Sequence, residues 1–167
     1  FATANDTTPI WSRDGKRVFF SSNRIGGKYQ VFETASDGGA EQRVLFTTAE
    51  ESWPTDVSPD GRFLIYFEGD LESRARGDLW AFDLTGARKP FPILNSQFTE
   101  RDGQFSPDGR WIAYSSKETG REEVFLVPFT AGPRPGAEGV QTSGKWQVST
   151  SGGSRPRWKP RGGELFF

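Results

Sequence analysis

A short motif with a tight turn at its centre recurs four times along this chain of 167 residues. The copies are PIWSRDGKRVFF from Pro9, TDVSPDGRFLIY from Thr55, GQFSPDGRWIAY from Gly103 and PRWKPRGGELFF from Pro156. The turn aspartates Asp14, Asp60 and Asp108 lie 46 and 48 residues apart, and Arg161 takes the same place 53 residues later. Such regular spacing indicates one structural unit used repeatedly, and it constrains the fold more than any other feature.

Each repeat has room for four short strands. The strand after the turn is expected at residues 18–21, 63–67 and 112–115, the next at 29–34, 79–84 and 124–129, and an outer strand at 44–46, 91–94 and 146–149. The 20 glycines and 11 prolines fall mostly between these apolar runs, and no segment shows a sustained helical period. A period just above 40 residues is typical of one four-stranded propeller blade. The sequence therefore predicts an all-β, partial β-propeller of about three and a half blades.

The predicted units form a single partial domain. They are residues 9–50, 51–99, 100–150 and an incomplete unit at 151–167, with residues 1–8 as the remnant of an outer strand. The chain opens at Phe1 and stops in mid-pattern at Leu165, Phe166 and Phe167, so it is expected to be part of a larger protein. Half a ring leaves more apolar surface bare than a monomer usually exposes. We expect a homodimer that completes the ring; blades from a longer parent chain are the alternative.

The third copy of the motif, FSPDGRWIAYSS from Phe105 to Ser116, carries a family resemblance. It resembles the TolB-type, WD40-like propeller repeat, and the likeness extends over nearly the whole chain. The segment from Gly144 to Trp158 also resembles propeller parts of bacterial receptor-like Ser/Thr kinases or similar sensor proteins, although no kinase motif is present. The resemblance implies a protein-interaction or sensor domain of a bacterial protein outside the cytoplasm. The residues themselves leave the compartment open.

The repeated turn residues have a structural interpretation. Proline presets its backbone angle, aspartate accepts hydrogen bonds from nearby backbone N–H groups, and glycine takes the position with positive φ. Copies of the aspartate about 45 residues apart belong to different blades, which argues against a shared metal site. One position before the turn is always apolar, and it is expected to pack between neighbouring blades, with a stacking platform for sugars or bases as the alternative. Its members are Trp11, Val57, Phe105 and Trp158.

Several classes of function are disfavoured by composition. Lys and Arg number 21 against 22 Asp and Glu, for a net charge of −1, which gives no reason to expect nucleic acid as a partner. No apolar run approaches the length that membrane insertion requires. The chain has no Cys and no His, which excludes thiolate zinc sites, Cys nucleophiles and His-dependent triads. No recognised catalytic motif is present, so no catalytic residue is named and no cofactor is required.

The candidate binding residues lie on the inner strands, which directly precede each turn and converge on the central channel of a propeller. They are Asp56, Arg101, Asp102, Arg155 and Arg157. Carboxylates and guanidiniums around a channel could hold a cation, an anion or a peptide end, or could simply neutralise one another. Trp53, which precedes an inner strand and could lie near an opening, is the aromatic candidate for ligand contact, with core packing as the alternative.

Two functions follow from these residues and the resemblance. The first is a propeller scaffold that binds a protein or small ligand. The alternative is a propeller hydrolase in which carboxylates hold a channel metal such as Ca²⁺, which would polarise phosphotriesters or lactones without any His or Cys ligand.

Overall fold

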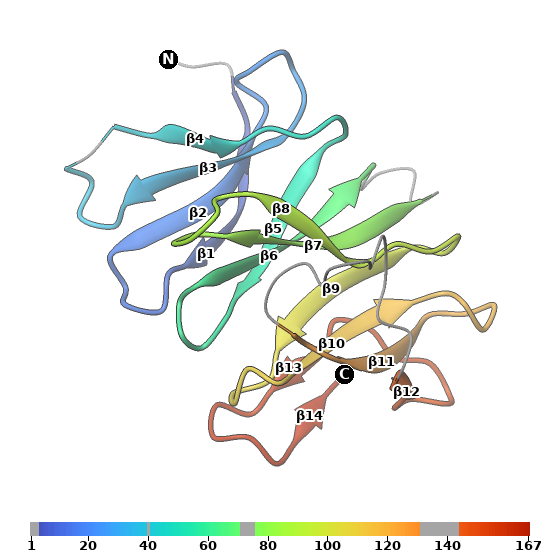
Figure 1. Ribbon diagram of the computed structural model, residues 1–167. Helices are drawn as coiled ribbons and strands as arrows, with labels where there is room; N and C mark the ends of the chain where they lie inside the picture. Colours follow the sequence, from blue (N-terminus) through green and yellow to red (C-terminus); the bar gives the residue numbers. More distant parts are fainter. Residues whose placement is uncertain (1–3, 40, 71–75, 131–143) are drawn as a thin grey trace.

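The computed structural model describes residues 4–39, 41–70, 76–130 and 144–167 (Figure 1). These residues form strands, turns and bends and no helix, so the described chain holds no helix that is long and apolar enough to cross a membrane. Four sheets follow one another from the N-terminus to the C-terminus (Figure 1). The predicted all-β class is confirmed.

Each of the first three sheets is a four-stranded antiparallel meander. The first contains β1 (Asp6–Trp11), β2 (Arg17–Ser22), β3 (Gln30–Ala35) and β4 (Arg43–Phe46). The second contains β5 (Ser52–Val57), β6 (Phe63–Gly69), β7 (Gly77–Asp83) and β8 (Pro90–Leu94). The third contains β9 (Glu100–Phe105), β10 (Trp111–Ser116), β11 (Glu123–Pro128) and β12 (Trp146–Gln147). The fourth is the pair β13 (Arg157–Trp158) and β14 (Leu165–Phe166).

Three four-stranded sheets and one pair agree with the expected three and a half blades. One boundary differs, because the predicted start of the first unit at residue 9 falls inside β1. Asp6, Ser52 and Glu100 each begin an inner strand six residues before the turn serine. Residues 6–8 therefore belong to the first inner strand, where Asp6 and Thr7 pair with β2, and do not form an outer-strand remnant. Residues 1–3 lie outside the described chain.

The turns have the predicted chemistry. In the second repeat the Ser58 hydroxyl donates to Asp60 at 2.5 Å and accepts from the Phe63 backbone N–H at 2.8 Å. Asp60 also accepts from the Arg62 N–H at 3.0 Å. The same three bonds form in the first and third repeats, whose turn aspartates are Asp14 and Asp108. All three aspartates are exposed, as expected.

The fourth turn keeps the backbone conformation without these side-chain bonds. Lys159 and Arg161 replace the serine and the aspartate. The Gly162 N–H still donates to the Lys159 carbonyl at 2.8 Å, and Gly162 has a φ of 77°. The side-chain network thus supports a turn that the backbone and its glycine can form alone.

We expect the turn glycine to matter through its backbone angle alone. Gly15 has a φ of 69°, and a Cβ placed on it would meet no atom within 4 Å. Gly15→Val should therefore destabilise the protein by about 1 kcal/mol or more through strain. The neighbouring Lys16→Val is the matched control, because Lys16 is equally exposed. Thermal unfolding should show a lower Tm for the first variant only; equal Tm values would contradict the assigned turn.

Neighbouring sheets pack face to face through the position before the turn. Val57 and Phe105 are 1% and 3% exposed and belong to the two cores, one between the first and second sheets and one between the second and third. The predicted packing between blades is confirmed for these two residues. Trp158 is half-buried. Trp11 is 61% exposed, because no sheet of the described chain lies on that side of β1.

At the two ends of the array, side chains are exposed at repeat positions that are buried between the inner sheets. Phe166 pairs with the inner strand just as Phe19 and Ile65 do, and those two residues are fully buried against the following sheet. Phe166 is 57% exposed, and Trp11 occupies the place that Val57 takes when it packs on Phe19. A further sheet, from another copy or from a longer parent chain, would cover this surface.

We propose that another copy supplies this sheet, in a head-to-tail homodimer in which Trp11 of one copy packs on Phe166 of the other. Light scattering should give about twice the 18.6 kDa of one chain. Trp11→Ala and Phe166→Ala should each weaken association, because each removes a large apolar side chain from the contact. Ile25→Ala, in the exposed turn between β2 and β3, should not. A wild-type protein that stays monomeric at high concentration would contradict this expectation.

Candidate functional site

The candidate site is a cavity of about 360 Å³ at the turn ends of the inner strands, which we term the channel-mouth cavity. Three positions of the repeat build it. The inner-strand position contributes Asp56, Gln104 and Arg157, the position before the turn contributes Phe105 and Trp158, and the position after the turn serine contributes Arg13, Pro59, Pro107 and Pro160. The cavity therefore draws on all four sheets.

Asp56 is the central acidic group of this cavity. Its side chain is 16% exposed, and Oδ1 accepts from Arg13 Nη2 at 3.1 Å. Its Oδ2 accepts from the Phe105 backbone N–H at 2.8 Å. Burial raises the pKa of Asp56, while Arg13, the backbone N–H groups and Arg157 act in the opposite direction. The carboxylate thus joins the second sheet to the first and the third.

Arg13 was not predicted, although the sequence carries a signal for it. The first repeat has Ser-Arg-Asp-Gly where the second and third have Ser-Pro-Asp-Gly, so an arginine replaces a proline at the mouth. Arg13 Nε donates to the Val57 carbonyl at 2.8 Å, in addition to the ion pair with Asp56. These bonds fix Arg13 across the seam between the first two sheets.

Arg157 lines the same cavity as Asp56, so the structure brings together two of the predicted site residues. It is exposed, and its Nη1 donates to the neighbouring Pro156 carbonyl at 3.0 Å. Beside it, the Trp158 indole N–H donates to the Gln104 carbonyl at 3.3 Å. With two guanidiniums and one carboxylate, the cavity carries a formal charge of +1, which suits an anionic group.

Arg101 and Asp102 lie elsewhere, at the opposite end of β9. Arg101 Nε donates to Glu122 at 2.8 Å and lies 3.8 Å from Asp102 Oδ2. Asp102 Oδ2 accepts from the Ser115 hydroxyl at 3.1 Å. Arg101 thus pairs with two carboxylates of the same repeat, in line with the alternative interpretation that these charges pair with one another. A role in ligand binding remains a prediction for them.

Arg155 belongs to a recurring bend of the inner strands. Its backbone N–H donates to the Ser115 hydroxyl at 3.0 Å, and its φ is 53°. Thr8 and Asp102 lie at the same distance before their turns and have φ values of 49° and 59°. The register of β1, β5 and β9 shifts at this place. The repetition indicates a β-bulge that shapes each inner strand rather than strain at one binding site.

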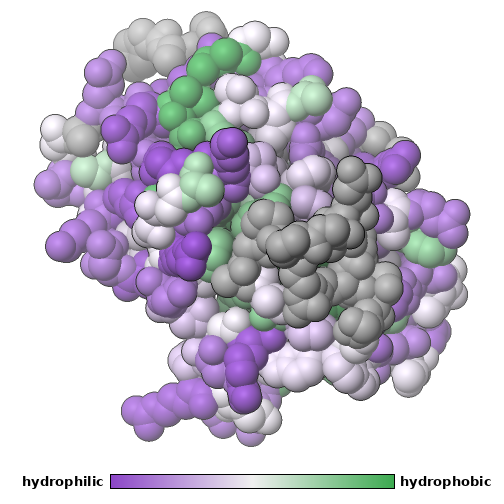
Figure 2. All heavy atoms as spheres, viewed as in Figure 1, coloured by the Kyte–Doolittle hydropathy of each residue, from purple (hydrophilic) through white to green (hydrophobic). Residues whose placement is uncertain are grey.

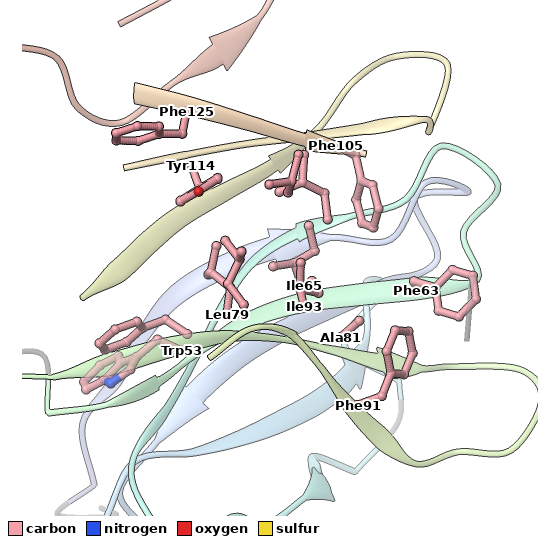
Figure 3. Packing of buried hydrophobic residues seen from close by; sticks show 14 residues of the cluster. Trp53, Phe63, Ile65, Leu79, Ala81, Phe91, Ile93, Phe105, Tyr114 and Phe125 are labelled. Carbon is pink, nitrogen blue, oxygen red and sulfur yellow. The ribbon is translucent and has the colours of Figure 1, made fainter. Parts of the chain in front are cut away.

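Trp53 is 7% exposed and belongs to the core between the second and third sheets (Figure 3). The centroid of its ring lies 4.4 Å from the ring centroid of Tyr29. It also lines a separate cavity of about 620 Å³ with Thr7, Lys28, Glu50, Glu51 and Asp70. Trp53 therefore packs in the core and takes no part in the channel-mouth cavity.

A third cavity, of about 480 Å³, gathers acidic groups between β6 and β7. Glu50, Glu68, Asp70 and Asp78 line it with Arg76. Burial raises the pKa values of Glu68 and Asp78, and Asp78 raises that of Glu68 further. Across the described ranges, no three Asp or Glu side chains are arranged to hold a metal ion. The calcium site considered from sequence remains a prediction.

Glu100, at the start of β9, is a buried carboxyl near these acidic groups. The Ser96 hydroxyl donates to its Oε1, and its Oε2 has no hydrogen-bond partner within the described residues. Burial raises the pKa of Glu100 to about 7; Asp78 and Glu118 add to the increase, and Lys145 opposes it.

This carboxyl should make stability depend on pH. A folded pKa above the ordinary value of 4.5 means that Glu100 stabilises the fold below that value and loses this contribution as the pH rises through about 7. Glu100→Gln keeps the shape without the charge, so it should raise Tm at about pH 8 and change it little near pH 5. The exposed Glu164→Gln is the control. The same Tm change at both pH values would contradict the assignment.

Comparison with known proteins gives the same repeat over most of the chain. The family described as TolB beta propeller domain matches residues 2–146. The Tol-Pal system protein TolB of Pseudomonas aeruginosa is 30% identical over 146 residues, covering 74% of this chain and 34% of that protein. An uncharacterized protein of Agrobacterium fabrum is 26% identical over 113 residues, covering 64% of this chain and 38% of that one.

Solved structures agree in fold. A TolB-like structure from Agrobacterium tumefaciens superposes with a TM-score of 0.78 at 24% identity, covering 99% of this chain and 54% of that one. TolB from Acinetobacter baumannii superposes with a TM-score of 0.71 at 16% identity, covering 96% of this chain and 37% of that one. A puromycin-hydrolyzing peptidase of Mycobacterium tuberculosis superposes with a TM-score of 0.65 at 17% identity, covering 98% of this chain and 26% of that one. The chain thus spans about half or less of the length of these proteins, and it belongs to the TolB β-propeller family.

Proposed function

We propose that this chain is a binding scaffold whose channel-mouth cavity takes an anionic group of a protein or small ligand, such as the carboxylate end of a peptide. The observation that carries the proposal is the meeting of Arg13, Asp56 and Arg157 in one cavity of about 360 Å³. The TolB relative from P. aeruginosa is a component of the Tol-Pal system, which supports a role in protein interaction. The absence of a recognised catalytic motif from the sequence agrees with this role.

The two arginines have different tasks in this proposal. Arg13 is held by Asp56 and by the carbonyls of Val57 and Ser58, so it supplies fixed positive charge. Arg157 donates one hydrogen bond within the described residues and presents a planar guanidinium to the cavity. A guanidinium can hold a carboxylate through two parallel hydrogen bonds. Arg157 is therefore the residue proposed to contact the ligand, and Asp56 sets the position of Arg13.

The hydrolase alternative has no observation of its own in its favour. The fold is shared with a peptidase, but a likeness at 17% identity extends to the fold alone. The described carboxylates form no metal-binding group. Hydrolysis of phosphotriesters or lactones remains a prediction from the sequence.

Binding of short peptides tests the proposal. Peptides with a free carboxyl end should bind more tightly than the same peptides amidated, with Trp158 fluorescence as the readout because this residue lines the cavity. Arg157→Gln should lower the affinity for the free-carboxyl form about tenfold or more, since a charge-assisted pair is lost. Arg110→Gln, whose guanidinium is exposed and paired with Asp108, is the matched control. Equal binding of free and amidated peptides would overturn the proposal.

A further inference from the structure

Two cavities lie at the ends of the inner strands opposite the channel mouth. Their volumes are about 620 Å³ and about 480 Å³, and both are lined by Glu50 and Asp70. The larger one lies between β1, β5 and the links that lead to β3 and β5, and the smaller one lies at the ends of β6 and β7 that face their connection. These elements belong to the first and second sheets, and each of these sheets has four strands. We term the two cavities together the acidic groove.

Negative charge predominates in the acidic groove. Its described lining holds five carboxylates and two cationic side chains, for a formal charge of −3. These residues are Glu50, Glu51, Glu68, Asp70 and Asp78, with Lys28 and Arg76. The Lys28 ammonium donates to a backbone group, the Ala49 carbonyl, at 2.9 Å. The groove therefore suits a positively charged ligand, whereas the channel-mouth cavity suits an anionic one.

Glu68 and Asp78 lie directly opposite each other on β6 and β7. Two like charges at such a position destabilise an antiparallel sheet. Asp78 Oδ1 is also buried without a hydrogen-bond partner within the described residues. The buried carboxylates Glu33 and Asp83, by contrast, each pair with an arginine. A cation between Glu68 and Asp78 would relieve the repulsion and could supply the donor that Asp78 lacks.

One tryptophan lines each cavity of the acidic groove. Trp80 is half-buried and lines the smaller cavity, and the face of an indole ring attracts ammonium and guanidinium groups. Trp53 lines the larger cavity and is 7% exposed, and its Nε1 has no hydrogen-bond partner within the described residues. Figure 3 shows its indole at the end of the core away from Phe91. Because an indole N–H can only donate, the partner that it lacks is an acceptor, such as a carbonyl oxygen.

We propose that the acidic groove binds a basic side chain of a peptide together with the adjoining main chain. The guanidinium or ammonium group lies between Glu68 and Asp78 and against the Trp80 ring, and a peptide carbonyl accepts from the Trp53 N–H. Carboxylates hold guanidinium groups through charge-assisted hydrogen bonds. Both cavities fall within the range of about 300–1,000 Å³ that is typical of ligand sites. This site is separate from the channel-mouth cavity and does not depend on the function proposed for it.

Titration calorimetry with short peptides tests this proposal. The probe is acetyl-Gly-Arg-Gly-amide, whose blocked ends leave the guanidinium as its one charge. The matched peptide with citrulline in place of arginine keeps the shape of the side chain without its charge. The arginine peptide should bind about tenfold more tightly or better, because the citrulline peptide loses the charge-assisted bonds. Spermidine, which has amines and no carbonyl, should bind more weakly than the arginine peptide.

Variants of the protein complete the test. Glu68→Gln removes one of two facing charges, so it should raise the Tm of the free protein and lower its affinity for the arginine peptide about tenfold. A misfolded variant could not give both results. Trp53→Phe keeps an aromatic ring without the N–H and should lower the affinity severalfold. Glu41→Gln, at an exposed position before β4, should change neither Tm nor affinity.

Four results would overturn the proposal. They are equal binding of the arginine and citrulline peptides, tighter binding of spermidine than of the arginine peptide, unchanged affinity in Glu68→Gln, and binding of Ca²⁺ without binding of the arginine peptide.

Discussion

The packing of each sheet against the next is the interaction on which the rest of this structure depends. Every four-stranded sheet has two apolar faces, and an interior sheet such as the second buries both. The turns, the bulges and the cavities all occupy the edges of these seams. The hydrophilic surface is interrupted by apolar patches, one of which lies at the top of Figure 2, near the N-terminal sheet. Places that are buried inside the array are exposed at its two ends, as at Trp11 and Phe166.

The same places in successive seams use different chemistry. Between the second and third sheets they hold phenylalanines, and at the last seam they hold tryptophans. At the first seam Glu33 is buried and accepts from Arg17 at 3.2 Å and from Arg43 at 2.9 Å. A buried carboxylate is tolerated there because two guanidiniums pair with it. The fold thus determines which positions of neighbouring sheets are in contact, and the residue types at these positions differ from one pair of sheets to the next.

Buried polar groups hold the links between consecutive sheets. Gln30, at the start of β3, accepts from the Thr48 N–H at 2.7 Å and donates to the Glu50 carbonyl at 3.1 Å. Glu123, at the start of β11, accepts from the Ser149 hydroxyl and from the Gly152 N–H at 3.0 Å. Both side chains satisfy backbone groups of the segment that leads to the next inner strand. These bonds tie each of these sheets to the segment that leads to the next inner strand.

The sequence by itself determined the repeat, the strands and the turns, because their causes are local. Alternating apolar residues, a Ser-Pro-Asp-Gly turn and a positive-φ glycine act over a few residues, so the array of three and a half blades could be predicted from them. Only the tertiary structure decided which charged residues meet. Asp56 and Arg157 share one position of the repeat and one cavity. Arg101, Asp102 and Arg155 lie further from their turns, and their hydrogen bonds go to residues of the third repeat. Arg13, in the turn of the first repeat, completes the site. Contacts between sheets depend on bulges, register and the packing of one sheet on the next. These act between residues far apart in the sequence, and no local pattern carries that information.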